Sequence, residues 1–375
     1  MRNPQTDGFI SVDDHVQEPP DLWLKRLSNT KWGDRIPHLE PQPDGTERWV
    51  IDGQELPLTG ALMPDRNQEP QRWEEAPPVA YVPAERLKAM DAGGVDYSVL
   101  YPTVSGLAGE TFGRIRDAEL ELACVRAYND WLVEEWAGAS KRFIPQCILP
   151  IYPVDAAVKE VKRAVAKGHR GVIYPAVPME LRDVPHINEP DYDALWATCQ
   201  DLEAPICFHA GASNALQLQP YSGFSPKLSA ALQAMTRPAS SIFIVVNLLL
   251  SKILLRFPKL KVVFAESALG WGSYLLEYAD YQFNNDRLYL EGYPMKPSEM
   301  FRRQCYLTGW YDRASLKERG LIGVENILWS TNFSLASSTW PESRDAVALS
   351  FDGLSDDERR RILWGNAAGL YKIEA

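Results

Sequence analysis

The segment Phe9–His15 reads FISVDDH: an apolar run that ends in acids and a histidine. The segment Ile206–His209 (ICFH) also ends in a histidine. Such short apolar runs are typical of buried strands in a parallel sheet. Six more lie along the chain, and where they carry an acid it stands at the C-terminal end. They are Tyr97–Pro102, Phe143–Pro150, Gly171–Pro175, Val262–Glu266, Cys305–Gly309 and Ile327–Asn332.

Segments with helical spacing of apolar residues alternate with these runs. The clearest are Asp117–Ala137, Asp155–Ala166, Asp191–Leu202, Gly272–Phe283 and Ser355–Trp364, the last with a Ser/Glu capping box. The alternation over 375 residues predicts an α/β protein: one (β/α)8 TIM-like barrel domain spanning residues 1–375. All strand ends of such a barrel open at one mouth, so the polar residues at these ends are expected to converge there.

The connection after the first run is exceptional. Residues 19–83 are rich in Pro, Trp, Arg and acids, and the segment is too long for an ordinary loop. We interpret it as an insertion that lids the mouth or forms a subunit contact, with a mobile surface loop as an equal alternative. Within it, RWVIDGQELPL at residues 48–58 predicts a small hairpin.

Composition argues against several classes of protein. The net charge is −11, with 39 Lys+Arg against 50 Asp+Glu, so the chain lacks the basic field that nucleic acid binding needs. The polar start MRNPQTDG lacks a signal peptide's apolar core, and the apolar stretch Ile242–Leu250 is far shorter than a membrane span. We expect a cytoplasmic protein without a membrane partner, whose 5 cysteines, none in a CxxC pair, are buried thiols.

Asp13, His15 and His209 have the chemistry of a metal site. Three nitrogen and oxygen ligands, with a position left open for water or substrate, suit one divalent ion. A lone histidine at the end of a strand is more often a structural hydrogen-bonding group. That alternative weakens because acids and histidines recur at several strand ends.

A set of motifs resembles one enzyme family over nearly the whole chain. The sequence is similar to the amidohydrolase-related (amidohydrolase family 2) branch of the amidohydrolase superfamily, which includes aminocarboxymuconate semialdehyde decarboxylase and γ-resorcylate decarboxylase. The resemblance implies a (β/α)8 barrel, commonly one divalent metal, and decarboxylation, hydration or hydrolysis of small, often aromatic, carboxylated molecules. The motifs are ISVDDHVQEPPDLW (10–23), GVDYSVLYPT (94–103), RFIPQCILPI (142–151), YDALWATCQDLEAPICFHAG (192–211), RFPKLKVVFAES (256–267), ILWSTNF (327–333) and ILWGNAAGLY (362–371).

The family's residues carry over unevenly. Its first-strand metal pair matches Asp13 and His15, its fifth-strand ligand matches His209, and Glu266 stands at the end of the sixth strand. The fourth run has no lysine to bridge a second metal, which implies a one-metal site. In the eighth strand the family usually reads Ser-Asp-Tyr-Pro-His. Here Asn332 replaces the metal-bound aspartate and Leu335 the histidine.

Asn332 changes the charge and the proton chemistry that the resemblance implies. An amide can ligate a metal through its oxygen, but it cannot exchange a proton near neutral pH. A divalent ion with one carboxylate and two neutral imidazoles keeps a formal charge near +1, which suits an anionic substrate. Glu266 is the candidate for the proton transfer; a purely structural acid is the equal alternative.

The leading interpretation is a metal-dependent decarboxylase or related C–C lyase that acts on a small carboxylated, aromatic or polyketide-like molecule. Its metal ligands would be Asp13, His15, His209 and Asn332, with zinc expected and manganese or iron as alternatives; Glu266, Asn332 and His209 would be catalytic. Trp271, Trp310 and Trp340 would line the substrate, though loop packing explains each equally well. Alternatives are a hydrolase with Glu266 as base, and a metal-free barrel enzyme or binding protein. Relatives imply a homodimer or larger assembly.

Overall fold

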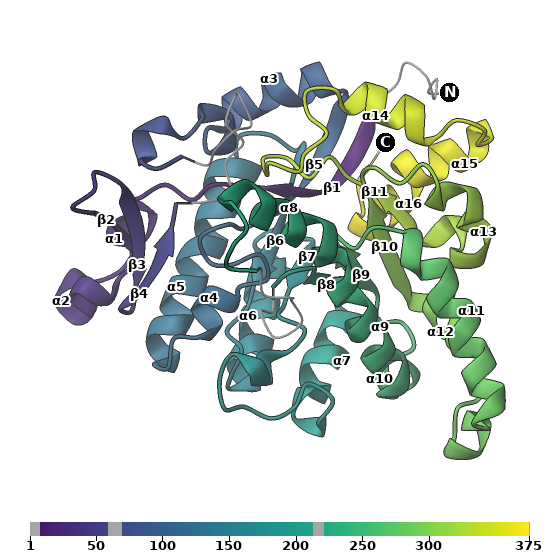
Figure 1. Cartoon of the computed structure of the whole chain (residues 1–375). Coiled ribbons are helices and arrows are strands. Elements are labelled where there is room, and N and C mark those ends of the chain that lie inside the picture. Colours follow the sequence, from purple (N-terminus) through teal and green to yellow (C-terminus); the bar gives the residue numbers. More distant parts are fainter. Residues whose placement is uncertain (1–7, 59–69, 213–220, 375) are drawn as a thin grey trace.

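The computed structural model describes residues 8–58, 70–212 and 221–374, and within them an eight-stranded parallel barrel (Figure 1). Each strand pairs with the next in chain order. The last and first strands approach where the Thr331 N–H donates to Ser11 Oγ at 2.8 Å. The predicted barrel is confirmed. Its strands are β1 (Phe9–His15), β5 (Val95–Tyr101), β6 (Phe143–Ile148), β7 (Gly171–Ile173), β8 (Ile206–His209), β9 (Val262–Ala265), β10 (Cys305–Gly309) and β11 (Ile327–Trp329).

Helices surround the barrel, and α5 and α15 begin at capping side chains. Asp117 accepts the backbone N–H groups of Glu119 and Leu120, and Ser355 forms the predicted capping box with Glu358. The longer helices are α3 (Pro83–Gly93), α5 (Ala118–Trp131), α6 (Val154–Ala166), α7 (Asp193–Asp201), α8 (Pro226–Thr236), α9 (Ser240–Leu250), α11 (Gly270–Asn285), α12 (Pro297–Gln304) and α14 (Ser343–Ser350). Shorter ones are α1 (Leu22–Arg26), α2 (Asn29–Trp32), α4 (Glu110–Gly113), α10 (Ile253–Arg256), α13 (Arg319–Ile322), α15 (Asp356–Arg360) and α16 (Asn366–Tyr371). All five cysteines are free and buried, as expected.

Five strands (β5, β6, β7, β9 and β11) end earlier than the sequence predicted, and the difference at β9 and β11 concerns the site. β9 ends at Ala265 and β11 at Trp329, whereas the predicted runs extended to Glu266 and Asn332. Glu266 has φ 48° and Asn332 has φ 55°. This left-handed backbone cannot continue a strand. Both side chains therefore stand on the turns that follow their strands.

The insertion after β1 contains the predicted hairpin. β3 (Glu47–Ile51) and β4 (Gln54–Pro57) pair in antiparallel fashion, and β2 (His38–Pro41) extends this small sheet. Trp49 is 1% exposed and its ring meets that of Trp23 edge-on at 5.7 Å, which anchors the hairpin to the rest of the chain. Residues 59–69 of the insertion lie outside the described part. Whether it acts as a lid or a subunit contact stays a prediction.

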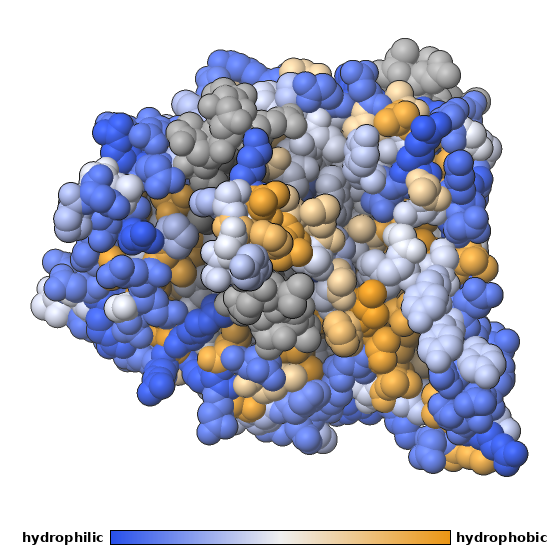
Figure 2. Space-filling view, viewed as in Figure 1, coloured by the Kyte–Doolittle hydropathy of each residue, from blue (hydrophilic) through white to orange (hydrophobic). Residues whose placement is uncertain are grey.

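The helices α8 and α9 form a longer apolar segment than the sequence suggested. Pro226–Leu250, 25 residues, is long and apolar enough to cross a membrane by length and composition, and 28% of its most apolar window is buried. The sequence interpretation considered only Ile242–Leu250, which is followed by Ser251 and Lys252. One face of α9 packs into the core, while Met235 and Phe243 are exposed. Figure 2 shows hydrophobic surface where α8 and α9 lie in Figure 1. The absence of a membrane partner stays a prediction.

Candidate metal centre

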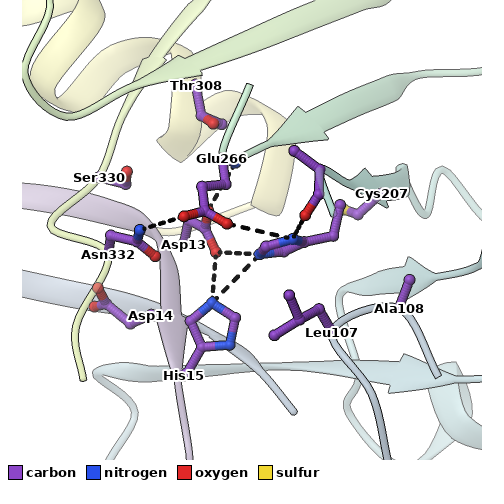
Figure 3. A network of polar contacts seen from close by, with 12 residues as sticks. Asp13, Asp14, His15, Leu107, Ala108, Cys207, Glu266, Thr308, Ser330 and Asn332 are labelled. Carbon is purple, nitrogen blue, oxygen red and sulfur yellow. Dashed lines mark hydrogen bonds and ion pairs between the residues drawn. The ribbon is translucent and has the colours of Figure 1, made fainter. Parts of the chain in front are cut away.

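Asp13, His15 and His209 meet inside the barrel mouth, as predicted (Figure 3). Asp13 Oδ1 lies 3.4 Å from His15 Nε2 and 3.5 Å from His209 Nε2, and the two Nε2 atoms are 3.3 Å apart. All three side chains are buried. Ligand atoms about 2.0–2.1 Å from a tetrahedral ion are roughly 3.3–3.4 Å apart, so this triangle has the size that a metal requires.

The histidine tautomers direct electron pairs into the triangle. His15 Nδ1 lies 3.0 Å from the Pro102 carbonyl oxygen, and His209 Nδ1 lies 2.7 Å from that of Ala210. A carbonyl only accepts, so each Nδ1 carries the hydrogen, and each neutral ring presents the Nε2 lone pair to the other and to Asp13. Three acceptors thus converge with no donor among them, which is unfavourable unless a cation lies between them.

The electrostatics of the triangle also favour positive charge. Burial alone would raise the pKa of Asp13, but the attraction of His209 and His15 outweighs burial and holds it below its usual range. Burial opposes protonation of His209, yet Asp13 raises the pKa of that imidazole. Asp13 Oδ2 accepts the Glu266 N–H at 2.8 Å, while Oδ1 has no hydrogen-bond partner within the described chain. The residues present fit a divalent ion.

Glu266 is held by two neighbours beside the triangle. Arg237 Nη1 donates to both of its carboxylate oxygens at 3.0 Å, and Asn332 Nδ2 donates to Oε1 at 3.0 Å. Glu266 Oε2 lies 3.9 Å from His209 Nδ1. Glu266 therefore stands close enough to the triangle to act there, but any proton it takes must compete with Arg237 and Asn332 for the same oxygens.

Asn332 presents its amide oxygen without a partner. Its Nδ2 donates to Glu266 and, at 2.8 Å, to Ser337 Oγ, which fixes the amide orientation. Its buried Oδ1 has no hydrogen bond to any described residue. Figure 3 draws Asn332 near Asp13. The role of Asn332 as a weak ligand or a substrate contact stays a prediction.

The three tryptophans that the sequence analysis selected do not share one wall. The indole N–H of Trp271 donates to the Ser267 carbonyl at 2.7 Å, and that of Trp340 to the Ala89 carbonyl at 3.1 Å. Trp310 lines a separate cavity together with Ser337. Their role in substrate binding stays a prediction.

Two parts of the site were missed from the sequence. Asp14 is buried and accepts hydrogen bonds from Ser98, Thr331 and Ser11 at 2.6–2.7 Å, so it ties β1 to its neighbours and steadies the metal ligands beside it. Arg237, the second, reaches Glu266 from the turn between α8 and α9. The sequence feature that could have drawn attention to Arg237 is a cation within an otherwise apolar helical segment.

Comparisons with known proteins agree with this geometry. A family model described as amidohydrolase matches residues 38–373, which leaves Asp13 and His15 outside the match. γ-Resorcylate decarboxylase of Polaromonas sp. (strain JS666) is 25% identical over 302 residues, covering 77% of this chain and 86% of that protein.

Two solved structures share the fold. An amidohydrolase from Mycobacterium avium subsp. paratuberculosis K-10 has a TM-score of 0.78 at 21% identity, covering 98% of this chain and 99% of that one. Dihydroxybenzoic acid decarboxylase from Polaromonas sp. JS666, with bound manganese and the inhibitor 2-nitroresorcinol, has a TM-score of 0.66 at 20% identity, covering 99% and 98%. At these identities the likeness shows the barrel fold.

Proposed function

This chain belongs to the amidohydrolase family, and from that membership we propose that it is a metal-dependent decarboxylase or related C–C lyase of a small carboxylated, aromatic molecule. The observation that carries the proposal is the triangle of Asp13 Oδ1, His15 Nε2 and His209 Nε2, with spacings of 3.3–3.5 Å. Support for the reaction class comes from the relatives, which are decarboxylases of aromatic carboxylates.

Asp13, His15 and His209 would hold the ion, and the carbonyls of Pro102 and Ala210 would keep both imidazoles in the ligating tautomer. When bound, a divalent ion would supply a Lewis acid that binds an oxygen of the substrate and stabilises negative charge developing on it. Asn332 Oδ1 would accept a hydrogen bond from a substrate hydroxyl or complete the ligand set. Burial of the triangle excludes bulk water, which favours a lyase.

Proton transfer to the carbon that loses carbon dioxide needs a group other than Asn332. Glu266 is that group in our proposal, because its carboxylate lies beside the triangle, 3.9 Å from His209 Nδ1, and Asn332 and Arg237 keep it in place. The hydrolase alternative would give Glu266 the role of base toward water. Both oxygens of Glu266 accept hydrogen bonds, which makes Glu266 no better as a base toward water than as the proton-transfer group of a lyase.

We also propose one ion per chain, zinc, manganese or iron; the manganese of the structural relative supports a site of this type. Homodimer formation and a cytoplasmic location remain part of the proposal.

The test is carbon dioxide release from a panel of carboxylated aromatics by metal-loaded protein. We expect turnover that disappears in His209→Ala and falls by about a hundredfold or more in Glu266→Gln, with metal retained in the latter. Hydrolysis of esters or lactones without carbon dioxide release would support the hydrolase instead.

A further inference from the structure

A cavity of about 420 Å³ is lined by Arg237, the residue that contacts Glu266 beside the metal centre. Its walls come from segments far apart in the sequence: the hairpin of the insertion, the loop after β5, the end of α8 and the loop after β11. Leu107 of the β5 loop lines this cavity, and Figure 3 places Leu107 next to His15 on one side of the triangle. The cavity is therefore a natural place for the part of a substrate that extends from the metal.

Arg237 is the cation of this cavity. Among the described lining residues, Arg237 and Glu110 are the charged ones. Glu110 accepts the backbone N–H groups of Ala108 and Leu107 at 2.7 and 3.2 Å, and burial raises the pKa of its carboxyl above the usual range. A guanidinium, in contrast, stays protonated throughout the ordinary pH range.

Two features fix the Arg237 side chain in place. Its Nη1 contacts both oxygens of Glu266. Its stem occupies the space over Gly211, where an added Cβ would come within 2.7 Å of Arg237 Cδ. Gly211 has φ 82°, so glycine also suits the backbone there. Because the side chain is held before any ligand binds, it loses little entropy on binding.

We propose that Arg237 is a specificity-determining residue that binds a carboxylate of the substrate in this cavity. This inference rests on the proposed function, which assigns the neighbouring metal site. Glu266 is a positioning residue for this contact, because its ion pair with Arg237 holds the guanidinium in place.

Calorimetric binding to metal-loaded protein tests the proposal. The two ligands are γ-resorcylate (2,6-dihydroxybenzoate) and its amide, 2,6-dihydroxybenzamide, which differ in charge and little in shape. Wild-type protein is expected to prefer the carboxylate. Arg237→Gln should weaken carboxylate binding by about tenfold to a hundredfold and change amide binding by less than about twofold. Arg237→Lys, which keeps the charge, should retain most of the preference.

Lys227→Gln is the matched control, since Lys227 is exposed on α8, the helix that precedes Arg237, and is absent from the described cavity lining. Unchanged carboxylate affinity in Arg237→Gln would overturn the inference. So would equal losses in both Gln variants, or a wild type that does not distinguish the ligands or binds neither. Metal content is measured in parallel. If the protein holds no metal and its preference for the carboxylate still depends on Arg237, the proposed function is contradicted and the inference about Arg237 stands.

Discussion

Asn332→Asp is the substitution that examines the charge balance of the site most closely. In the wild type, Asn332 Nδ2 donates to Glu266 Oε1 at 3.0 Å, and both residues are buried. Aspartate would place an acceptor against an acceptor. Loss of a hydrogen bond to a charged group costs about 1.5–3 kcal/mol. Repulsion of two unit charges 3 Å apart at an effective dielectric of about 20 adds roughly 5 kcal/mol before proton uptake relieves it.

We expect metal-free Asn332→Asp to be less stable than wild type by about 7 kcal/mol at pH 8, and Asn332→Ala by about 2 kcal/mol. The difference between the two variants isolates the repulsion. It should shrink at pH 5, because a carboxyl whose pKa is raised in the folded state loses stability as the pH rises. Added manganese should stabilise Asn332→Asp more than wild type, because the new carboxylate is a better ligand for a hard cation.

The assay is denaturant unfolding of chelator-treated protein at both pH values, repeated with metal. If metal-free Asn332→Asp were as stable as Asn332→Ala at pH 8, the contact between residue 332 and Glu266 would be wrong.

Three further predictions concern the surroundings of the site. Burial raises the pKa of Glu18 to about 7, although the hydrogen bond from the Val104 N–H opposes this in part. The unfolding free energy of the wild type should therefore fall by up to about 3 kcal/mol relative to that of Glu18→Gln as the pH rises from about 4.5 to 7. A difference between the two proteins that does not change with pH would contradict this. In Gly211→Ala, the added Cβ would lie 2.7 Å from Arg237 Cδ, at a backbone φ of 82° that favours glycine. This variant should lose about 1–2 kcal/mol of unfolding free energy and bind γ-resorcylate more weakly. Wild-type affinity for γ-resorcylate would count against the placement of Arg237. The five cysteines are buried, and burial raises the pKa of the Cys207 thiol to about 12. A thiol reagent should therefore modify none of them before the protein is denatured. Rapid labelling of the native protein would contradict their burial.

Much of the architecture was readable because strands and helices leave periodic patterns. Runs such as Ile206–His209 are short, apolar and bounded by turns, and the structure places that strand at the same residues. The convergence of Asp13, His15 and His209 also followed, since a barrel brings its strand ends to one mouth.

The rest depended on contacts that no local pattern encodes. Arg237 reaches Glu266 from 29 residues away along the chain, and Asp14 is bound by hydroxyls of β5 and the β11 loop. The ends of β9 and β11 were overextended because left-handed backbone at Glu266 and Asn332 is not visible in residue type. Trp271 and Trp340 have suitable chemistry at suitable places, yet their indole N–H groups bond to nearby carbonyls.

The metal content of protein purified without chelator, compared with that of His209→Ala, tests the central claim most directly. The described structure brings His209 Nε2, His15 Nε2 and Asp13 Oδ1 within 3.5 Å of one another, so we predict close to one equivalent of zinc, manganese or iron in the wild type and loss of that metal in the variant. Metal far below one equivalent, unchanged by His209→Ala, would contradict the account and direct attention to metal-free chemistry around Glu266 and Asn332.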